Sequence, residues 1–237
     1  AQMMRSRRVN LFHEHVLVKE PGTAEPTPWH HDQPYWSVDG RQVMSFWIPL
    51  DPVARETCVE YVKGSHRWGR WFQPKFFKQG GVDLQVQDSR FEPLPDLDAE
   101  RGEHEFLAWD MEPGDLLVVH PWTLHYSGGN PEDFWRIAVS VRVFGDDIRW
   151  APRPDCVNLA GVSFDEMLEG EAPMGSHFPL LWSEDGRSDG DADYPRGFAT
   201  RWRKQEMGGV NEYAKFKELE RKEKTGALSA RDRSPEN

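Results

Sequence analysis

Residues 134–144 read FWRIAVSVRVF, and residues 9–19 read VNLFHEHVLVK. Such runs, rich in Val, Ile, Phe and Trp and bounded by turn-forming residues, are typical of β-strands. The chain between them contains further runs of the same kind, at residues 42–50, 58–64, 104–109 and 114–120. Helical periodicity is hard to find in this part of the sequence, so we expect an all-β core of sandwich or jelly-roll type.

We expect residues 1–150 to form this core and residues 151–237 to form an irregular and helical extension packed on the same domain. In the extension, Ser163 and Glu166 form a capping box, which predicts one short helix. Residues 211–224 combine helix-forming residues with interleaved charges, which predicts a solvent-exposed helix.

The composition excludes several classes of protein. Of the 237 residues, 38% are hydrophobic and 12% are aromatic, which is enough to fill a core and excludes a wholly disordered chain. The 40 acidic residues outnumber the 29 basic ones and give a net charge of −11, which repels polyanions. We therefore expect no nucleic acid and no membrane as the main partner, and no apolar run is long enough to span a bilayer.

The chain has two cysteines, Cys58 and Cys156, which is too few for a disulfide framework. This usage is typical of a reducing compartment, and we expect a cytoplasmic protein that is a monomer or a homodimer. The first residues, AQMMRSRRVN, contain no apolar stretch of a secretory signal.

The strongest chemical signal lies at residues 28–36, PWHHDQPYW, which contain a His-x-Asp pair formed by His30 and Asp32. Side chains at positions i and i+2 of an extended segment point the same way. An imidazole nitrogen and a carboxylate oxygen are then presented to one point, and His31 points away. We expect His31 to support this site or to be exposed.

A further ligand must come from a distant strand, and residues 114–130 offer His120 and His125. Two histidines and one carboxylate form the facial triad of non-haem Fe(II) oxygenases, which leaves positions open on the metal. His120 shares strand parity with Leu116 and Val118, so it is either the rival ligand or a packed, hydrogen-bonded core histidine.

Arg136 lies inside one of the apolar runs, where an unpaired guanidinium would be costly to bury. Its planar group is well suited to gripping a carboxylate in bidentate fashion. The alternative is an arginine paired with a structural aspartate or exposed on a strand face.

Taken in order, these motifs resemble the phytanoyl-CoA dioxygenase-like (PhyH) family of Fe(II)/2-oxoglutarate-dependent oxygenases. The resemblance covers about residues 10–145. Its parts are Trp29-His30-x-Asp32 followed by Tyr35 and Trp36, FWIPLD at 46–51, Lys-Gly-Ser-His at 63–66, Gly-Asp-Leu-Leu at 114–117, and a distal His followed by Ser, Gly, Asn and Arg136.

The resemblance implies a double-stranded β-helix, the jelly-roll or cupin-like fold, with peripheral helices. It implies His30, Asp32 and His125 as the iron ligands, because His125 has the family's spacing of 11 residues to the arginine. It further implies Arg136 as the anchor of the distal carboxylate of 2-oxoglutarate. Ser127 and Trp47 are implied as further residues of the cosubstrate pocket.

The activity implied by the resemblance uses Fe(II), 2-oxoglutarate and O2 to hydroxylate a C–H bond of a small organic substrate, releasing succinate and CO2. Asp32 favours hydroxylation, because halogenating relatives lack this carboxylate. Family members usually carry a helical portion well before the His-x-Asp motif. Here His30 stands so early that we expect an N-terminal part of the natural protein to be missing.

Two alternatives remain open at this point. His13-Glu14-His15 with Glu20 resembles the first metal motif of cupins, and a non-redox cupin-like metalloenzyme would use these residues instead of the triad. A binding protein that keeps the fold but has lost turnover is the second. In the oxygenase, His13 and His15 line the cavity from a strand face. Lys19, of the same parity, either contacts the cosubstrate or is a solvated lysine at a strand end.

Overall fold

The computed structural model describes residues 1–76, 82–83, 89–153, 167–175 and 177–187. These residues all belong to one unit of the chain, Ala1–Ala192. The short helix expected at Ser163 and the helix expected at residues 211–224 lie outside the described residues, as does most of the extension expected at residues 151–237.

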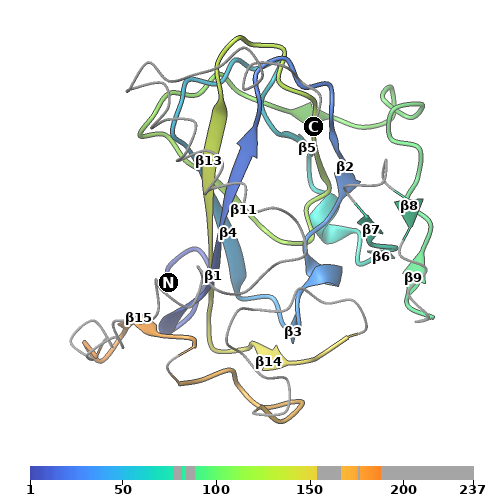
Figure 1. Cartoon of the computed structure of the whole chain (residues 1–237). Coiled ribbons are helices and arrows are strands. Elements are labelled where there is room, and N and C mark those ends of the chain that lie inside the picture. Colours follow the sequence, from blue (N-terminus) through green and yellow to red (C-terminus); the bar gives the residue numbers. More distant parts are fainter. Residues whose placement is uncertain (77–81, 84–88, 154–166, 176, 188–237) are drawn as a thin grey trace. The chain divides into compact units, whose positions relative to one another are not determined.

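Two antiparallel sheets form the body of this unit (Figure 1). The larger sheet has the order β11-β4-β13-β1-β15, made of β11 (Leu117–Val119), β4 (Val43–Pro49), β13 (Arg136–Phe144), β1 (Arg8–Lys19) and β15 (Leu180–Ser183). The smaller sheet has the order β10-β5-β12-β2, made of β10 (Phe106–Leu107), β5 (Glu60–Val62), β12 (His125–Ser127) and β2 (Thr27–His30). This arrangement confirms the predicted jelly roll.

Smaller elements complete the described fold. Three strand pairs lie beside the sheets, β3 (Val38–Asp39) with β14 (Arg149–Trp150), β6 (Trp71–Phe72) with β9 (Phe91–Glu92), and β7 (Lys75–Phe76) with β8 (Val82–Asp83). Within the described residues the helices are two 3-10 turns, η1 (Gln33–Tyr35) and η2 (Ser65–Arg67). The expected peripheral helices therefore have no further counterpart in this part of the chain.

All six runs that the sequence marks as strands contain one, namely β1, β4, β5, β10, β11 and β13. In the two sheets, the strands β2, β12 and β15 lie outside these runs and were not predicted. β2 and β12 contain Pro28, His30 and His125 instead of an apolar run, and they become strands because β12 pairs with both β2 and β5.

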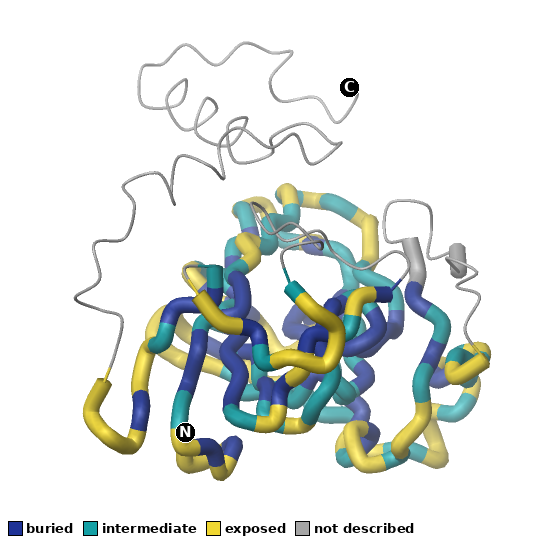
Figure 2. Tube along the Cα trace, turned by 90° about the horizontal axis from the view of Figure 1, so that it is seen from below, coloured by how far each residue is buried: buried dark blue, intermediate teal, exposed yellow. Residues whose placement is uncertain are grey.

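Alternating burial along the central strands places one face of the larger sheet inside (Figure 2). Two apolar clusters lie along this face. One contains Phe12, Trp36, Val38, Val43, Phe144, Ile148, Trp150 and Phe178, and the other contains Trp47, Val53, Cys58, Val59, Tyr61, Met111 and Ala138. Between them, the inward positions of β13 are Ser140 and Arg142, both buried. The interior therefore has a polar middle between two apolar ends.

The pairing of β1 with β13 contains a bulge between Leu11 and His13. Because a bulge adds one residue to one strand, the two consecutive residues Phe12 and His13 are both buried. Beyond the bulge, His13 pairs with Arg142, and the register runs on regularly to the last pair, Lys19 with Arg136. This register fixes which side chains of β1 face the interior.

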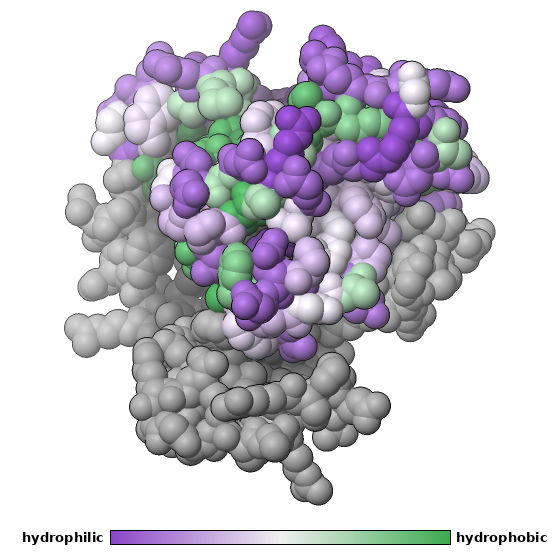
Figure 3. All heavy atoms as spheres, turned by 90° about the horizontal axis from the view of Figure 1, so that it is seen from above, coloured by the Kyte–Doolittle hydropathy of each residue, from purple (hydrophilic) through white to green (hydrophobic). Residues whose placement is uncertain are grey.

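At one end of the larger sheet, apolar side chains reach the surface. Leu50 follows β4, Leu116 precedes β11 and Phe134 precedes β13, and these side chains are 51%, 50% and 41% exposed. Figure 3 shows apolar residues among polar ones in the view from above. Within the described residues, no helix has the length and apolar character needed to cross a membrane.

The loop after β12 packs closely against the end of β1. Asn130, which is fully buried, donates hydrogen bonds from Nδ2 to the carbonyl oxygens of Lys19, Glu20 and Phe134 at 3.2, 3.2 and 2.8 Å. The preceding Gly129 has no room for a side chain, because a Cβ atom there would lie 2.2 Å from the Thr23 carbonyl oxygen.

We predict that Gly129→Ala lowers the free energy of unfolding by about 1–3 kcal/mol, the usual cost of an atom forced into packed surroundings. The matched control is Gly128→Ala, since a Cβ atom on Gly128 meets nothing nearer than Tyr126 Cε1 at 4.0 Å. Urea denaturation of both variants measures the difference. Equal midpoints for the two variants would contradict the close packing of this loop.

Candidate active site

His30, Asp32 and His125 meet between the two sheets. His30 is the last residue of β2 and His125 is the first residue of β12, and the two are register partners with ring centroids 4.1 Å apart. Asp32 Oδ1 lies 3.7 Å from His30 Nε2 and 3.9 Å from His125 Nε2. One ligand atom from each residue lies within 4.8 Å of the others, a spacing that a single metal ion can bridge.

The backbone conformation at Asp32 differs from the extended one that the sequence led us to expect. Asp32 is not extended but has helical dihedrals, φ −72° and ψ −32°, at the start of η1. Its N–H donates to the Pro121 carbonyl oxygen at 2.8 Å, which ties the turn to the chain just before His125. The expectation of an extended His-x-Asp segment is therefore wrong, although the two side chains still converge.

Hydrogen bonds fix how both imidazoles are presented. His30 Nδ1 lies 2.7 Å from the Pro28 carbonyl oxygen, and His125 Nδ1 lies 2.9 Å from the Thr123 carbonyl oxygen. A carbonyl can only accept, so each Nδ1 is the protonated donor and each Nε2 carries a lone pair toward Asp32. Two neutral Nε2 atoms and one carboxylate are the donor set of the facial triad.

Burial sets the charges of these groups. Burial lowers the pKa of His30 to about 3, so this imidazole is neutral near pH 7. For Asp32, burial works against ionisation, but nearby positive charge, including that of Arg142, outweighs it and the pKa of the carboxyl is lowered. The side chains of Asp32 and His125 remain 16% and 17% exposed, so the three groups are open to solvent on one side.

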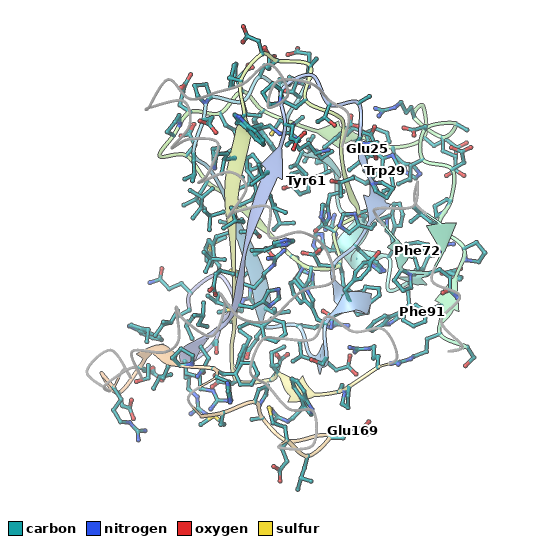
Figure 4. All side chains as sticks on the ribbon, in the orientation of Figure 1. Glu25, Trp29, Tyr61, Phe72, Phe91 and Glu169 are labelled. Atoms are coloured by element: carbon teal, nitrogen blue, oxygen red, sulfur yellow. The ribbon has the colours of Figure 1, made fainter. Side chains whose placement is uncertain are left out.

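Two aromatic rings hold the imidazoles in place. Tyr61, on β5, stacks against the His125 ring with centroids 5.7 Å apart, and Tyr35 meets the His30 ring edge-on at 6.0 Å. Tyr61 belongs to the same apolar cluster as Trp47 and Ala138 of the larger sheet, and it is labelled in Figure 4 together with Trp29. The triad is thus supported from both sheets.

The neighbouring histidines have other partners. His31 is buried, and its Nε2 accepts a hydrogen bond from the Phe72 N–H at 3.1 Å, so it is not an exposed residue. His120 lies 3.2 Å from the Arg41 carbonyl oxygen through Nε2 and accepts from the Trp122 N–H at 3.2 Å through Nδ1. Because both of its ring nitrogens are hydrogen-bonded to backbone groups, His120 is the packed, hydrogen-bonded histidine and not the rival metal ligand.

Arg136 lies at the start of β13 and is 7% exposed. Its Nη2 donates to Ser127 Oγ at 2.7 Å, and its Nη1 donates to the Thr57 carbonyl oxygen. Within the described residues, no carboxylate forms an ion pair with this guanidinium, and burial lowers its pKa. Trp47, the third expected pocket residue, is buried opposite Ser140 of β13.

Lys19 adds a second cation at this end of the sheet. It is the register partner of Arg136, and its Nζ donates to the carbonyl oxygens of Glu25, Ser127 and Gly128. Burial, and next the charge of Arg136, lower its pKa to about 8. Lys19 is thus a half-buried lysine at the end of β1 whose ammonium is held by backbone carbonyls, and the structure places two neighbouring cations beside Ser127.

His13, His15 and Glu20 do not form a metal site. Among the described residues, the group of His30, Asp32 and His125 is the one with ligand atoms close enough to share an ion. His13 is buried and pairs with Arg142 of β13 on the inner side of β1, and burial and then the charge of Arg142 lower its pKa. His15, two residues further along the strand, has the same parity and is exposed. The position of His13 is the one expected for a residue that lines the cavity, and not for a ligand of the cupin metal motif.

Comparison with known proteins agrees with the motifs. The family model for phytanoyl-CoA dioxygenase (PhyH) matches residues 1–138, which is more than half of the chain. The chain belongs to the PhyH family. This is a family of Fe(II)- and 2-oxoglutarate-dependent oxygenases, as the ordered motifs predicted, and its cofactors are Fe(II), 2-oxoglutarate and O2.

Curated relatives of this PhyH-family chain include two proteins named as phytanoyl-CoA dioxygenases. Phytanoyl-CoA dioxygenase 1 of Oryza sativa subsp. japonica is 23% identical over 141 residues, which covers 59% of this chain and 46% of the relative. The probable phytanoyl-CoA dioxygenase of Caenorhabditis elegans is 26% identical over 169 residues, covering 68% and 49%. The chain therefore spans about half the length of these curated relatives.

Solved structures support the fold. The non-heme alpha ketoglutarate dependent epimerase SnoN from nogalamycin biosynthesis matches with a TM-score of 0.55 and 24% identity, covering 74% of this chain and 64% of that one. The same epimerase in complex with Fe3+, alpha ketoglutarate and nogalamycin RO matches with a TM-score of 0.54 and 23% identity, covering 74% and 66%. At this identity the likeness shows the jelly-roll fold.

We predict that His30→Ala, Asp32→Ala and His125→Ala each weaken Fe(II) binding by at least about 10-fold, because each removes one of three donor atoms. His120→Ala is the matched control and should bind Fe(II) as the unchanged chain does, because its nitrogens are bonded to backbone groups. Anaerobic titration with Fe(II) measures all four variants. Loss of binding in His120→Ala with retention in His125→Ala would overturn the assignment.

Proposed function

We propose that this chain contains the catalytic core of an Fe(II)- and 2-oxoglutarate-dependent dioxygenase that hydroxylates a C–H bond of a small organic substrate and releases succinate and CO2. The observation that carries the proposal is the convergence of His30, Asp32 and His125 within 4.8 Å. Family membership and the buried Arg136 without a carboxylate partner among the described residues support it.

In this proposal His30 Nε2, the Asp32 carboxylate and His125 Nε2 would hold the iron. The bound iron, with 2-oxoglutarate and O2, supplies the oxidising chemistry. The protein contributes fixed geometry, because the carbonyl oxygens of Pro28 and Thr123 hold both rings by Nδ1. It also contributes protonation states that favour a divalent cation, a neutral His30 and an ionised Asp32.

Arg136 would pair with the far carboxylate of 2-oxoglutarate in the same proposal. Ser127 Oγ already accepts a hydrogen bond from Arg136 Nη2, so it fixes one arm of the guanidinium and borders the same space. Lys19 holds the carbonyl oxygens of Ser127 and Gly128 and adds a second positive charge. Two cations that form an ion pair with no carboxylate in the described part of the chain are a natural counterpart for a dianion.

Aromatic side chains would keep water from the reacting atoms. Tyr61 and Tyr35 pack on the two imidazoles, and Trp47 forms part of the apolar cluster next to Ser140. Such packing fixes the ligands and excludes water from one side of the centre, which limits side reactions of a reactive oxidant.

The proposal also covers the location, the oligomeric state and the partners of the protein. We infer a cytoplasmic protein, a monomer or homodimer, with a small-molecule substrate and without nucleic acid or membrane as its partner. Support comes from the net charge of −11 and from the two cysteines, of which Cys58 is free and buried. The pKa of the Cys58 thiol is raised by burial, so a nucleophilic thiolate is disfavoured.

The test of the proposed function uses the chain loaded with Fe(II) under argon. Adding 2-oxoglutarate should give a metal-to-ligand charge-transfer band, and admitting O2 should give succinate in an amount that depends on both components. Asp32→Ala, which lacks a triad donor, is the control and should give neither signal. A band-free spectrum with bound Fe(II) would favour the silent binding protein of the same fold.

We predict that Arg136→Leu weakens 2-oxoglutarate binding strongly and leaves Fe(II) affinity close to that of the unchanged chain. Loss of a buried bidentate pair costs on the order of 2–5 kcal/mol, or roughly 30- to several-thousand-fold in affinity. Arg136→Lys should recover part of the loss, since an ammonium cannot reproduce the planar fork. Titration of the charge-transfer band measures all three, and equal affinities would make Arg136 a structural residue.

A further inference from the structure

One edge of the larger sheet is covered along only part of its length. β15 pairs with β1 over Arg8–Asn10, and the Leu11 N–H donates to the Pro179 carbonyl oxygen at 2.9 Å. Further along, β1 pairs with β13 on its other side as far as Lys19 (Figure 1). Among the described residues, no backbone group pairs with the second edge of β1 after Leu11. The run Glu14–Val18 is therefore an open strand edge.

The hydrogen bonds of β13 show which residues of β1 face this open edge. The Ile137 carbonyl oxygen accepts from the Leu50 N–H at 2.8 Å. The Gly145 N–H donates to the Gln42 carbonyl oxygen at 2.7 Å. Odd-numbered residues of β13 therefore bond toward β4 and even-numbered ones toward β1, because successive residues of an antiparallel strand alternate in this way. Beyond the bulge, the even-numbered residues of β13 are register partners of odd-numbered residues of β1. The backbone groups left facing the open edge are those of Glu14, Val16 and Val18.

The open edge lacks the features that usually prevent strand pairing. Proteins protect such edges with proline, with outward lysines or with a covering segment. The residues between the bulge and Lys19 read HEHVLV, without proline or glycine. The Lys19 ammonium is turned to the carbonyl oxygens of Glu25, Ser127 and Gly128. Val16, in the middle of the edge, is 45% exposed. An apolar edge with unused backbone groups is a site at which another strand can add.

We propose that a second copy of this chain adds to this edge, β1 against β1, about a two-fold axis at Val16. A two-fold axis perpendicular to a sheet makes the two equal strands antiparallel, which is also the direction of β15 beside β1. Val16 then lies opposite Val16 of the second copy, and Glu14 lies opposite Val18. All three residues that face the edge exchange N–H···O=C hydrogen bonds in this register. The inference goes beyond the proposed function and does not depend on it.

The registers on either side pair the edge less well. An axis one residue closer to the end of β1 would set Glu14 opposite Glu20 of the second copy, and like charges in opposite positions are destabilising. An axis one residue closer to the start would set Val18 opposite Phe12, at the bulge, where the strand is irregular. With the axis at Val16 the edge is complementary to itself, which is why we infer a second copy and not an unrelated strand.

The side chains on the outer face of the sheet fit the same arrangement. Val16 and Val18 lie beside Val139 and Ile137 of β13, their register partners. Pairing would continue this apolar face across the axis and would cover the exposed Val16 side chains with each other. Glu14 lies at the end of the pairing, opposite an uncharged valine. Because the axis pairs the edge with itself, the assembly closes as a dimer.

The 237-residue chain itself is the sample for the experiment. Sedimentation velocity from about 5 to 500 µM should show a reversible monomer–dimer equilibrium, since one strand pair is a small interface and associates weakly. A mass of 27.5 kDa at every concentration, or assemblies larger than a dimer, would overturn the proposal.

Substitutions at the axis test its position. Val16→Lys and Val16→Glu each set like charges opposite each other, and each should weaken the dimer by at least about 10-fold. An equal mixture of the two should associate again, because a lysine then lies opposite a glutamate. Leu116→Lys and Leu116→Glu are the matched controls, since Leu116 is 50% exposed and precedes β11 at the other edge of the sheet, and they should dimerise as the unchanged chain does. A mixture that does not associate would overturn the axis at Val16.

Val16→Pro tests the backbone pairing. It removes an N–H that faces the open edge, so the sheet keeps its own hydrogen bonds. The dimer should weaken by at least about 10-fold, because the two hydrogen bonds donated at the axis are lost. Val16→Ala keeps the N–H and should weaken the dimer less. A folded Val16→Pro chain that dimerises as Val16→Ala does would reject strand pairing.

Urea denaturation shows whether each of these variants is folded. If Val16→Pro does not fold, the lysine and glutamate variants decide, because both keep the N–H of residue 16. Their separate loss of association and its recovery in the mixture then support the proposal, and unchanged association of either variant alone rejects it.

Discussion

The antiparallel pairing of β1 with β13 is the interaction on which the site depends. Its register places Lys19 beside Arg136 at one end and His13 beside Arg142 at the other, all on the face between the sheets. A slip by one residue would turn these side chains outward, because successive residues of a strand face opposite sides. Phe12 and Phe144, packed in one apolar cluster, oppose such a slip because it would expose them.

The residue types around a strand decided whether the sequence could predict it. β1 and β13 have twelve and nine residues of strongly apolar character, and the sequence marks both. β2 and β12 have four and three residues and contain Pro28, His30 and His125 at positions that read as loop. They become strands through pairing with each other and with β5, which is long-range information absent from any short window.

The candidate site, too, could be predicted only in part from the sequence. His30, Asp32 and His125 could be named only with the family resemblance, since the residues alone left His120 as a rival to His125. The helical turn at Asp32 could not be predicted, since it depends on the Pro121 carbonyl. The inward positions of His13 and Lys19 depend on the bulge after Leu11. A bulge adds one residue to a strand and so changes which of the following side chains face inward, and the residues around it do not indicate where the extra residue lies.

Net charge and local charge lead to different expectations about ligands. The chain carries −11 overall, yet many exposed charges are paired, such as Lys63 with Glu105 at 2.7 Å and Arg101 with Glu60 at 2.6 Å. Arg136, by contrast, is buried and has no carboxylate partner among the described residues. Exposed charges are screened over about 10 Å. The acidic surface therefore repels large polyanions, whereas small anions that reach the interior are attracted by the buried cations.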